Sequence, residues 1–317
     1  MISSCWKACL VASLFAGHTT ASRDGTQRPV VGILSVPLKA GGDCVTYFGA
    51  EAVQAPDAAA TSCFDNIYVK WIESAGGRVV PIRYDSSVDE LDKLFDNLNG
   101  VLFTGGDTVI TDLESQYMQS AGHLLNRSIA ASAKGDHVPV WGTCMGIQTL
   151  SILVANDPSV LQSGAYKGVD PLMMRLNLTT AGQSSRMYTA LPKEVQQWVV
   201  SEPVTTNLHH DGVTPDTFSS NEKLDNFFRV ISTNMDVNDL PFVSTIEGKV
   251  APVYGVQWHP ERPQFEWSKV DESGNDPINH SIHAVLSMQS FANFFVSEVR
   301  MNESFALVNT STVVLST

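Results

Sequence analysis

The segment VWGTCMGIQTL, residues 140–150, constrains the fold more than any other stretch of this sequence. An apolar run leads into it and apolar, helix-forming residues follow it, so a buried strand has to turn directly into a helix at Cys144. Gly142 and Gly146 flank that cysteine, as in the cysteine form of the G-x-S-x-G nucleophile elbow. In that turn the nucleophile is strained, and the glycines relieve crowding that side chains would cause. The alternative is a small buried cysteine in a tight turn.

Strand-like and helix-like segments alternate on both sides of this motif. Short apolar or β-branched runs occur at residues 29–36, 78–84, 100–106, 138–144, 227–234, 242–248 and 252–261. Helical spacing of apolar residues occurs at 62–76, 88–99, 112–134 and 282–299. This alternation predicts an α/β fold with a mostly parallel central sheet flanked by helices on both faces. We expect one domain over residues 29–300, loops and shorter strands within 155–225, and a peripheral tail at 301–317.

The first residues are typical of a secretory signal peptide. Lys7 precedes the short apolar stretch 8–17, and the small residues Thr19 and Ala21 then supply an acceptable cleavage site. We predict a signal peptide over residues 1–21, with a frayed N-terminus or a short membrane anchor as the alternatives. No other stretch approaches the roughly 20 apolar residues that a membrane-spanning helix needs.

Asparagine sequons agree with passage through the secretory pathway. Asn-X-Ser/Thr occurs at Asn126, Asn177, Asn279, Asn302 and Asn309, with no proline in the middle position. A single sequon arises often by chance, whereas five behind a signal-like segment favour a glycoprotein. We therefore expect a lysosomal, vacuolar or extracellular protein.

The cysteine count then indicates one thiol without a partner. Cys5 and Cys9 would leave with the signal peptide, which leaves Cys44, Cys63 and Cys144. In an oxidising compartment an odd count leaves one thiol unpaired or intermolecular. Cys44 and Cys63 flank a loop-like stretch and could form a disulfide, although sequence does not give the connectivity. Cys144 would then be the free thiol.

Charge and motif content limit the partners and cofactors. The formal net charge of −13 argues against nucleic acid or an anionic membrane surface as a partner. An anionic substrate would need local cations, and Arg175 and Arg186 in the irregular segment are candidates. Solvated surface arginines are the alternative. The histidines show no His-Glu-x-x-His spacing and the cysteines no Cys-x-x-Cys, so we expect neither metal nor cofactor.

A nucleophilic thiol needs a base, and His259 has a suitable position. It follows a buried strand within YGVQWHPE, so it lies beside Cys144 if the two strands are neighbours. Pro260 ends the strand, and Glu261 can orient the imidazole, which completes a triad defined by role. A structural histidine is the alternative.

The motifs PVWGTCMGIQ, VYGVQWHPE and VLFTGGD together resemble the class I glutamine amidotransferase-like superfamily. Further segments, including KWIESAGGRVVPIRYD and NEKLDNFFRVISTN, resemble more closely the γ-glutamyl hydrolases, peptidases of the C26 type. The resemblance covers roughly residues 29–300. It implies a flavodoxin-like sheet and hydrolysis of the γ-glutamyl amide bonds of folyl- or antifolate-poly-γ-glutamates, small-molecule substrates, with a homodimer as the family expectation.

The resemblance also implies roles for individual residues. Cys144 matches the nucleophile, His259 the base and Glu261 the third triad position. The main-chain N–H groups around Gly105 or Gly106 and the main-chain N–H of Met145 match the donors of the family's oxyanion hole.

Three further positions would contact the substrate. His209 lies where relatives also have a histidine near the site. Gln148 stands where many vertebrate-type γ-glutamyl hydrolases have an acidic residue, which bears on how the substrate's α-amino or α-carboxylate group is bound. Arg186 would meet the charge of the polyglutamate tail.

Two other functions remain open from the sequence. The first is a glutaminase subunit that delivers ammonia to a synthase, although no synthase domain follows in this chain. The second is a non-catalytic binding protein on the same scaffold, which would be expected to lack Cys144 or His259. Both residues are present.

Overall fold

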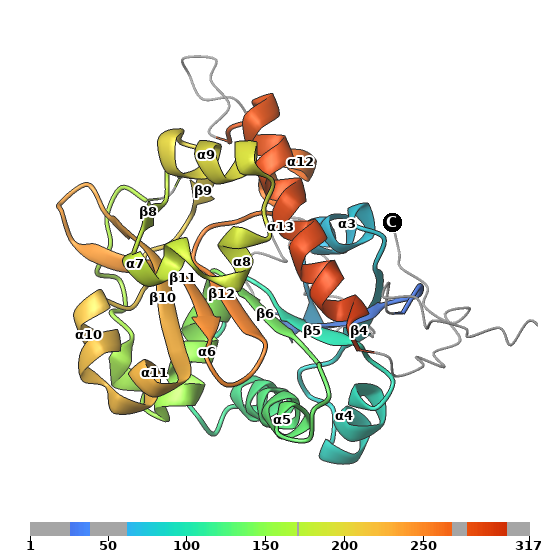
Figure 1. Ribbon diagram of the computed structural model, residues 1–317. Helices are drawn as coiled ribbons and strands as arrows, with labels where there is room; N and C mark the ends of the chain where they lie inside the picture. The colour runs from blue at the N-terminus through green and yellow to red at the C-terminus, as the bar shows by residue number, and fades with distance from the viewer. Residues whose placement is uncertain (1–25, 39–61, 170, 268–277, 303–317) are drawn as a thin grey trace, which may run out of the picture.

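The computed structural model describes residues 26–38, 62–169, 171–267 and 278–302. The strands of its main sheet are β1 (Val30–Leu34), β4 (Arg78–Ile82), β5 (Gly100–Phe103), β6 (Val140–Thr143), β8 (Asn177–Leu178), β10 (Phe228–Met235), β11 (Pro241–Gly248) and β12 (Val253–Val256). They form an eight-stranded sheet in the order β4-β1-β5-β6-β12-β11-β10-β8 (Figure 1). The first five strands of that order pair in parallel, and β11, β10 and β8 continue the sheet antiparallel. The predicted mostly parallel α/β sheet is confirmed.

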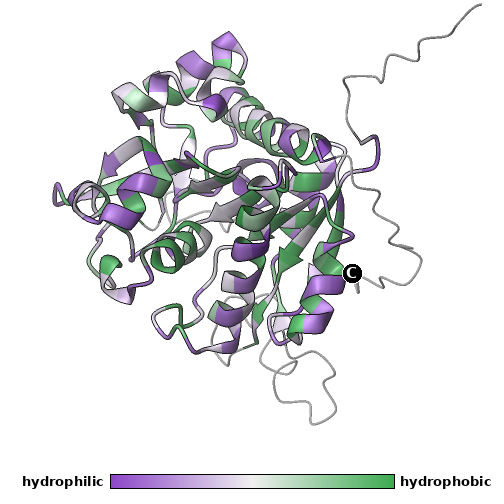
Figure 2. Cartoon of the chain, turned by 60° about the horizontal axis from the view of Figure 1, so that its bottom comes forward, coloured by the Kyte–Doolittle hydropathy of each residue, from purple (hydrophilic) through white to green (hydrophobic). Residues whose placement is uncertain are grey.

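Helices cover both faces of this sheet. One face carries α4 (Val88–Phe95), α5 (Gln116–Ser132), α6 (Met145–Ala155), α10 (Pro215–Ser220) and α11 (Glu222–Phe227); the other carries α3 (Asn66–Ser74), α9 (Lys193–Ser201) and α13 (Ile282–Arg300). Val101 and Phe103 of β5 pack into the first apolar layer, whereas Leu102 between them packs into the second. Successive strand side chains point to opposite faces, so one strand supplies both layers. Figure 2 shows the strands mainly in the hydrophobic colour and the outward helix turns in the hydrophilic one.

Side-chain caps set where the predicted helices begin. The Ser87 hydroxyl accepts from the Glu90 N–H, and the Glu90 carboxylate accepts from the Ser87 N–H, which forms a capping box at α4. Ser115 caps α5 through the Met118 N–H, so this helix begins at Gln116 rather than at residue 112 as expected.

The irregular middle segment differs from the expectation of loops and shorter strands. It does contain the short strands β7 (Leu172–Met174) and β9 (Thr205–Asn207), but short helices are more frequent, with α7 (Thr180–Gln183) and α8 (Arg186–Thr189) besides α9, α10 and α11. The polar residues that suggested loops are the caps of these helices. The helix-capping side chains are Thr179, Ser185, Thr214 and Asn221. Ser, Thr and Asn favour both loops and helix N-caps, and the spacing alone did not distinguish them.

Several predicted features lie wholly or partly outside the described residues. The signal peptide at 1–21, Cys44, Asn309 and the tail beyond residue 302 belong to this group. Cys63, in β3 (Ser62–Cys63), is disulfide-bonded, while its predicted pairing with Cys44 stays a prediction. Cys144 is the free cysteine of the described part. None of the helices described here is long and apolar enough to cross a membrane.

The described sequons differ in accessibility. Asn126 and Asn177 are exposed, and Asn279 is partly exposed. Asn302 is only 4% exposed, and its side-chain oxygen accepts a hydrogen bond from Asn99. This burial counts against glycan attachment at Asn302 in the folded chain, which corrects the prediction for that sequon.

The glycines around Cys144 make room for backbone rather than for a side chain. A Cβ on Gly142 would lie 2.6 Å from the carbonyl carbon of Gly146, and one on Gly146 would lie 2.4 Å from the carbonyl oxygen of Phe103. The strained residue between them is Cys144 itself, with φ 52° and ψ −106°. Close contact between β5, β6 and the first turn of α6 therefore requires both glycines.

We expect Gly146→Ala to lower the free energy of unfolding by about 1–3 kcal/mol or more, because its Cβ would meet main-chain atoms that cannot move aside. The control is Gly122→Ala in α5, where the added Cβ would meet only the flexible Leu153 side chain, at 3.3 Å. Alanine is favoured over glycine in helices by about 1 kcal/mol, so this variant should be at least as stable as the wild type. Urea unfolding measures both; equal stability of the two variants would contradict the close-contact explanation.

Candidate active site

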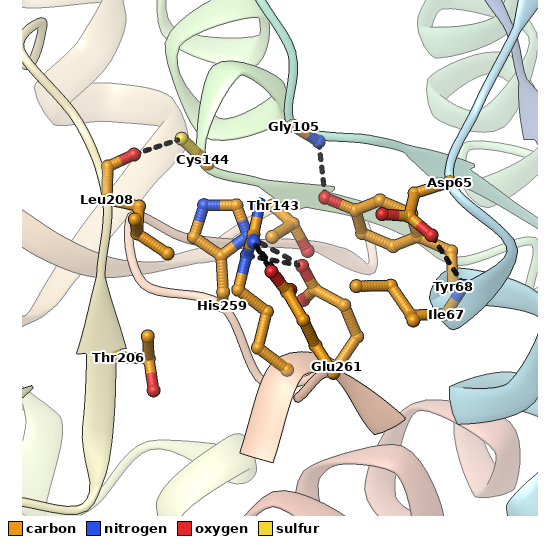
Figure 3. Close-up of polar contacts among 12 residues, drawn as sticks. Asp65, Ile67, Tyr68, Gly105, Thr143, Cys144, Thr206, Leu208, His259 and Glu261 are labelled. Carbon is orange, nitrogen blue, oxygen red and sulfur yellow. Dashed lines mark hydrogen bonds and ion pairs between the residues drawn. The ribbon is translucent and has the colours of Figure 1, made fainter. Parts of the chain in front are cut away.

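Cys144 directly follows β6 and occupies the N-cap position of α6, where its thiol is nearly enclosed. Its Sγ lies 3.6 Å from the Leu208 carbonyl oxygen (Figure 3). Nε2 of Gln257 lies 3.7 Å from the same sulfur. The Cys144 backbone N–H donates to the Val256 carbonyl at 2.8 Å. The elbow is therefore hydrogen-bonded directly to the last residue of β12.

His259 reaches the thiol because β6 and β12 are adjacent. Thr143 pairs with Val256, so both chains leave the sheet at the same edge, as the sequence predicts. The His259 backbone N–H donates to the Thr206 carbonyl at 2.8 Å, which fixes the residue after the strand ends. Figure 3 shows the imidazole between Cys144 and Glu261.

Glu261 orients the imidazole. His259 Nδ1 lies 2.6 Å from Glu261 Oε1, and the two side chains are 3% and 0% exposed. Because Nδ1 faces a carboxylate, it carries a proton and donates it in a hydrogen bond to Glu261. The other ring nitrogen, Nε2, is then the one available for proton transfer. Among the described residues Nε2 has no hydrogen-bond partner. The geometry is that of a base held by a carboxylate beside a nucleophile.

The buried pair is charged around neutral pH. Burial alone would lower the pKa of His259, but the Glu261 carboxylate outweighs burial and the pKa rises to about 9. Burial would raise the pKa of Glu261, yet His259 and Arg262 bring it below its ordinary value. The pair therefore holds a protonated imidazole beside Cys144.

The two glycines expected in the oxyanion hole differ in their hydrogen bonds. The Gly105 N–H donates to the Tyr68 hydroxyl at 2.8 Å, so an acyl oxygen would have to compete for it. The N–H groups of Gly106 and Met145 donate to no acceptor within the described ranges. A Cβ on Gly106 would lie 3.5 Å from Met145 Cε, so the two residues are neighbours. The available donor pair is therefore Gly106, which follows β5, and Met145, the first residue of α6.

His209 lies next to this site as a neutral ring. Its Nδ1 donates to the Asp211 carbonyl at 2.9 Å, and its ring packs edge-on against Phe242. Burial lowers the pKa of His209 to about 4. Its Nε2 is buried without a described partner, and the preceding carbonyl, of Leu208, contacts the thiol.

Gln148 holds two parts of the site together. Its Nε2 donates to the Asp211 carbonyl at 2.9 Å and to Gln257 Oε1 at 3.3 Å. Gln257 in turn directs its amide N–H at Cys144 Sγ. Gln257 was missed from sequence, although it precedes His259 by two positions and alternate strand residues share a face. Tyr68 was also missed, because a tyrosine within an apolar helix pattern gives no functional signal.

The structure does not bring Arg186 to the thiol. Its Nε donates to Glu298 of α13 at 2.7 Å, and its backbone N–H donates to Glu247. Glu247 pairs with Tyr254 near the start of β12, whereas the catalytic edge lies beyond the end of that strand. The buried carboxylate of Glu298 holds the guanidinium there, so the predicted role for Arg186 is wrong. Arg175 is exposed and makes no described contact with the triad.

The assembled groups have the requirements for acyl transfer: a nucleophile, an oriented base and two N–H donors. Such an arrangement is chemically suited to forming and hydrolysing a thioester on the cysteine. In the described part of the chain, no three His, Cys, Asp or Glu side chains are grouped to hold a metal ion.

Comparison with known proteins identifies the family. The peptidase C26 family model matches residues 44–261, a span that contains Cys144, His259 and Glu261. Human γ-glutamyl hydrolase is 41% identical over 235 residues, which cover 74% of this chain and 70% of the human protein. The mouse γ-glutamyl hydrolase is 37% identical over 299 residues, which cover 93% of this chain and 86% of the mouse protein. γ-Glutamyl hydrolase 1 of Arabidopsis thaliana is 31% identical over 274 residues, which cover 86% of this chain and 72% of the plant protein. The chain belongs to the peptidase C26 family.

Proposed function

We propose that this protein hydrolyses the γ-glutamyl amide bonds of folylpoly-γ-glutamates. The observation that carries the proposal is the buried His259–Glu261 pair beside the free thiol of Cys144 on a strained elbow. The relatives named γ-glutamyl hydrolase support a γ-glutamyl bond as the bond cleaved, and the sequence resemblance implies the folate part of the substrate. A γ-glutamyl bond is an amide of a side-chain carboxyl group, so a cysteine nucleophile suits it.

Acylation begins with attack of the Cys144 thiolate on the γ-carbonyl carbon. The carbonyl oxygen gains negative charge and is bound by the N–H groups of Gly106 and Met145, each worth on the order of 3 kcal/mol. The C–N bond then breaks, and His259 Nε2 gives its proton to the departing α-amine. A γ-glutamyl thioester remains on Cys144.

Deacylation uses the same groups in reverse. Neutral His259 takes a proton from water, and the hydroxide attacks the thioester carbon. The C–S bond breaks, the thiolate re-forms beside the imidazolium, and the shortened folate leaves with a free γ-carboxylate. Glu261 stays ionised throughout and stabilises the imidazolium.

Gln148 and His209 complete the proposed substrate contacts. Both present buried polar groups around the thiol, and neither is charged at neutral pH, since burial keeps His209 neutral. Gln148 bears on the alternative of a glutaminase subunit, because glutamine is the residue that the amidotransferases use at this position. Glutamine and a γ-glutamyl peptide offer the same carbonyl to Cys144, so activity has to separate these functions.

We propose the secretory pathway as the location, in a lysosome or vacuole or outside the cell, and a homodimer as the assembly. The signal-like residues 1–21 and the sequons support the location, and two of these sequons, Asn126 and Asn177, have exposed side chains. The dimer rests on the family resemblance alone.

Cys144→Ala should abolish hydrolysis, with a loss in kcat of about 10⁴-fold or more, because the nucleophile is removed while alanine still fits the elbow. The assay incubates wild type and variant separately with a folyl-polyglutamate and with glutamine, and measures shorter folates and ammonia. Wild type should produce shorter folates. Ammonia from glutamine without shorter folates would favour the glutaminase, and neither product would favour the binding protein. Unchanged circular dichroism and urea unfolding serve as controls for the variant's fold.

Glu261→Gln should move the alkaline limb of the pH–kcat/KM profile to lower pH. The wild type should lose activity as pH rises through about 9, where His259 loses its proton. Without the carboxylate, burial lowers the pKa of His259, so the limb should shift by about one unit or more. The free energy of unfolding should fall over the same pH range as the activity. Because folding raises the pKa of His259, its protonation stabilises the fold fully below pH 6.5, and this contribution is lost as the pH rises through about 9.

The matched control is Glu202→Gln, which removes a carboxylate that pairs with His283 at 2.8 Å outside the site. That variant should keep the wild-type profile. An alkaline limb at the same pH in Glu261→Gln and in the wild type would contradict the charge-pair assignment.

A further inference from the structure

The oxyanion side of the site contains a tyrosine that the mechanism above does not use. Tyr68, in α3, accepts the Gly105 N–H on its hydroxyl oxygen at 2.8 Å (Figure 3). Gly105 and Gly106 belong to the turn that supplies an oxyanion donor. One side chain from a different helix is thus bonded directly to that turn.

The hydroxyl of Tyr68 belongs to the catalytic centre by position. A Cβ built on Gly105 would lie 2.9 Å from that hydroxyl, 3.0 Å from His259 Cε1 and 3.3 Å from Cys144 Cβ. Tyr68, His259 and Cys144 therefore surround the Cα of Gly105, which has no side chain. A residue larger than glycine at position 105 would separate them.

Tyr68 is held on a rigid support. The Asp65 side chain caps α3 by accepting the Ile67 N–H at 3.1 Å. One turn further on, the indole of Trp71 donates to the Met288 carbonyl of α13 at 3.2 Å. Tyr68 itself is 4% exposed. Its ring is consequently fixed, and the hydroxyl is a stationary acceptor.

The glycine turn, by contrast, lacks side chains that could fix it. Gly106 has φ +146°, a conformation that other residues rarely adopt, and glycine backbones have the most freedom to lose. An N–H donor helps the transition state only if its direction is fixed beforehand. The hydrogen bond from Gly105 to Tyr68 fixes the peptide immediately before the Gly106 N–H.

We propose that Tyr68 is a positioning residue of the oxyanion hole, whose hydroxyl holds the Gly105–Gly106 turn so that the Gly106 N–H faces the acyl oxygen. This inference rests on the proposed hydrolysis through a Cys144 thioester. Burial, with the nearby Glu261 charge, raises the pKa of Tyr68 well above its ordinary value. The phenol therefore stays neutral at working pH and serves as an acceptor.

Tyr68→Phe tests the proposal, because it keeps the buried ring and removes only the acceptor. We expect kcat on a folyl-polyglutamate to fall about 10- to 100-fold with KM within about twofold, since the missing contact matters in the transition state. The Ki of a pteroylglutamate analogue with a γ-aldehyde should rise by a similar factor, because its hemithioacetal oxygen occupies the same hole. Alkylation of Cys144 by iodoacetamide needs no oxyanion hole, so its rate should stay unchanged.

The matched control is Tyr188→Phe, which removes a hydroxyl that donates to the Gln196 carbonyl at 3.0 Å away from the site. It should leave kcat, the aldehyde Ki and the alkylation rate as in the wild type. If Tyr68→Phe fails to fold, 3,5-difluorotyrosine at position 68 keeps the hydroxyl and weakens it as an acceptor. That protein should show a smaller loss of kcat and a matching rise in the aldehyde Ki.

Two results would overturn the role of Tyr68. The first is an unchanged kcat and aldehyde Ki in the folded variant. The second is a fall in alkylation rate equal to the fall in kcat, which would show that Tyr68 acts on the thiol. Failure of the proposed function is a separate result, because the wild-type protein itself would then not shorten the folyl-polyglutamate.

Discussion

The parallel pairing of β6 with β12 is the interaction on which the rest of the site depends. Thr143 and Val256 are partners at its end, and the Cys144 N–H closes the pairing on the Val256 carbonyl. Parallel strands end at the same edge, so one register places a nucleophile from one strand and a base from the other side by side. A one-residue slip of either strand would turn the side chains of that strand to the opposite face of the sheet. The buried apolar layers on the two faces exclude that slip, because each strand residue has an assigned side.

A second constraint is that the His259–Glu261 ion pair is buried. Removing an ion pair from water costs several kcal/mol per ion, and the mutual attraction of His259 and Glu261 offsets that cost only with good geometry. The short contact between Nδ1 and Oε1 supplies it, and the Arg262 guanidinium lies 3.9 Å from the same carboxylate oxygen. A buried ion pair adds little net stability, so the use that we propose for this one is catalytic. It holds a proton on the imidazole at pH values where an isolated buried histidine would be neutral, which is the state of His209 nearby.

The sequence predicted those parts of the site that depend on local pattern. The G-x-C-x-G turn, the strand before His259 and the adjacent glutamate all follow from residues close together in the chain, and the fold agrees with them. Arg186 was misplaced, because its partner Glu298 lies more than a hundred positions away and only the packing of α13 reveals it. Tyr68 was missed for the same reason, since it acts through a contact with Gly105, which is distant in the sequence. Gln257, in contrast, could have been found from its alternation with His259. In the middle of the chain, helix caps were taken for loop residues, since Thr, Ser and Asn suit both.

The triad and the glycine turn are held in place in different ways. Cys144 directly follows β6 and His259 follows shortly after β12, and backbone hydrogen bonds to Val256 and Thr206 fix the two residues. The turn that presents the Gly106 N–H needs a glycine at position 105, because Tyr68, His259 and Cys144 occupy the space that a Cβ on Gly105 would fill. That freedom would leave the turn poorly directed unless another group held it. A hydroxyl from a capped helix, bonded to the first of the two glycines, restores the direction without occupying the space next to the thiol.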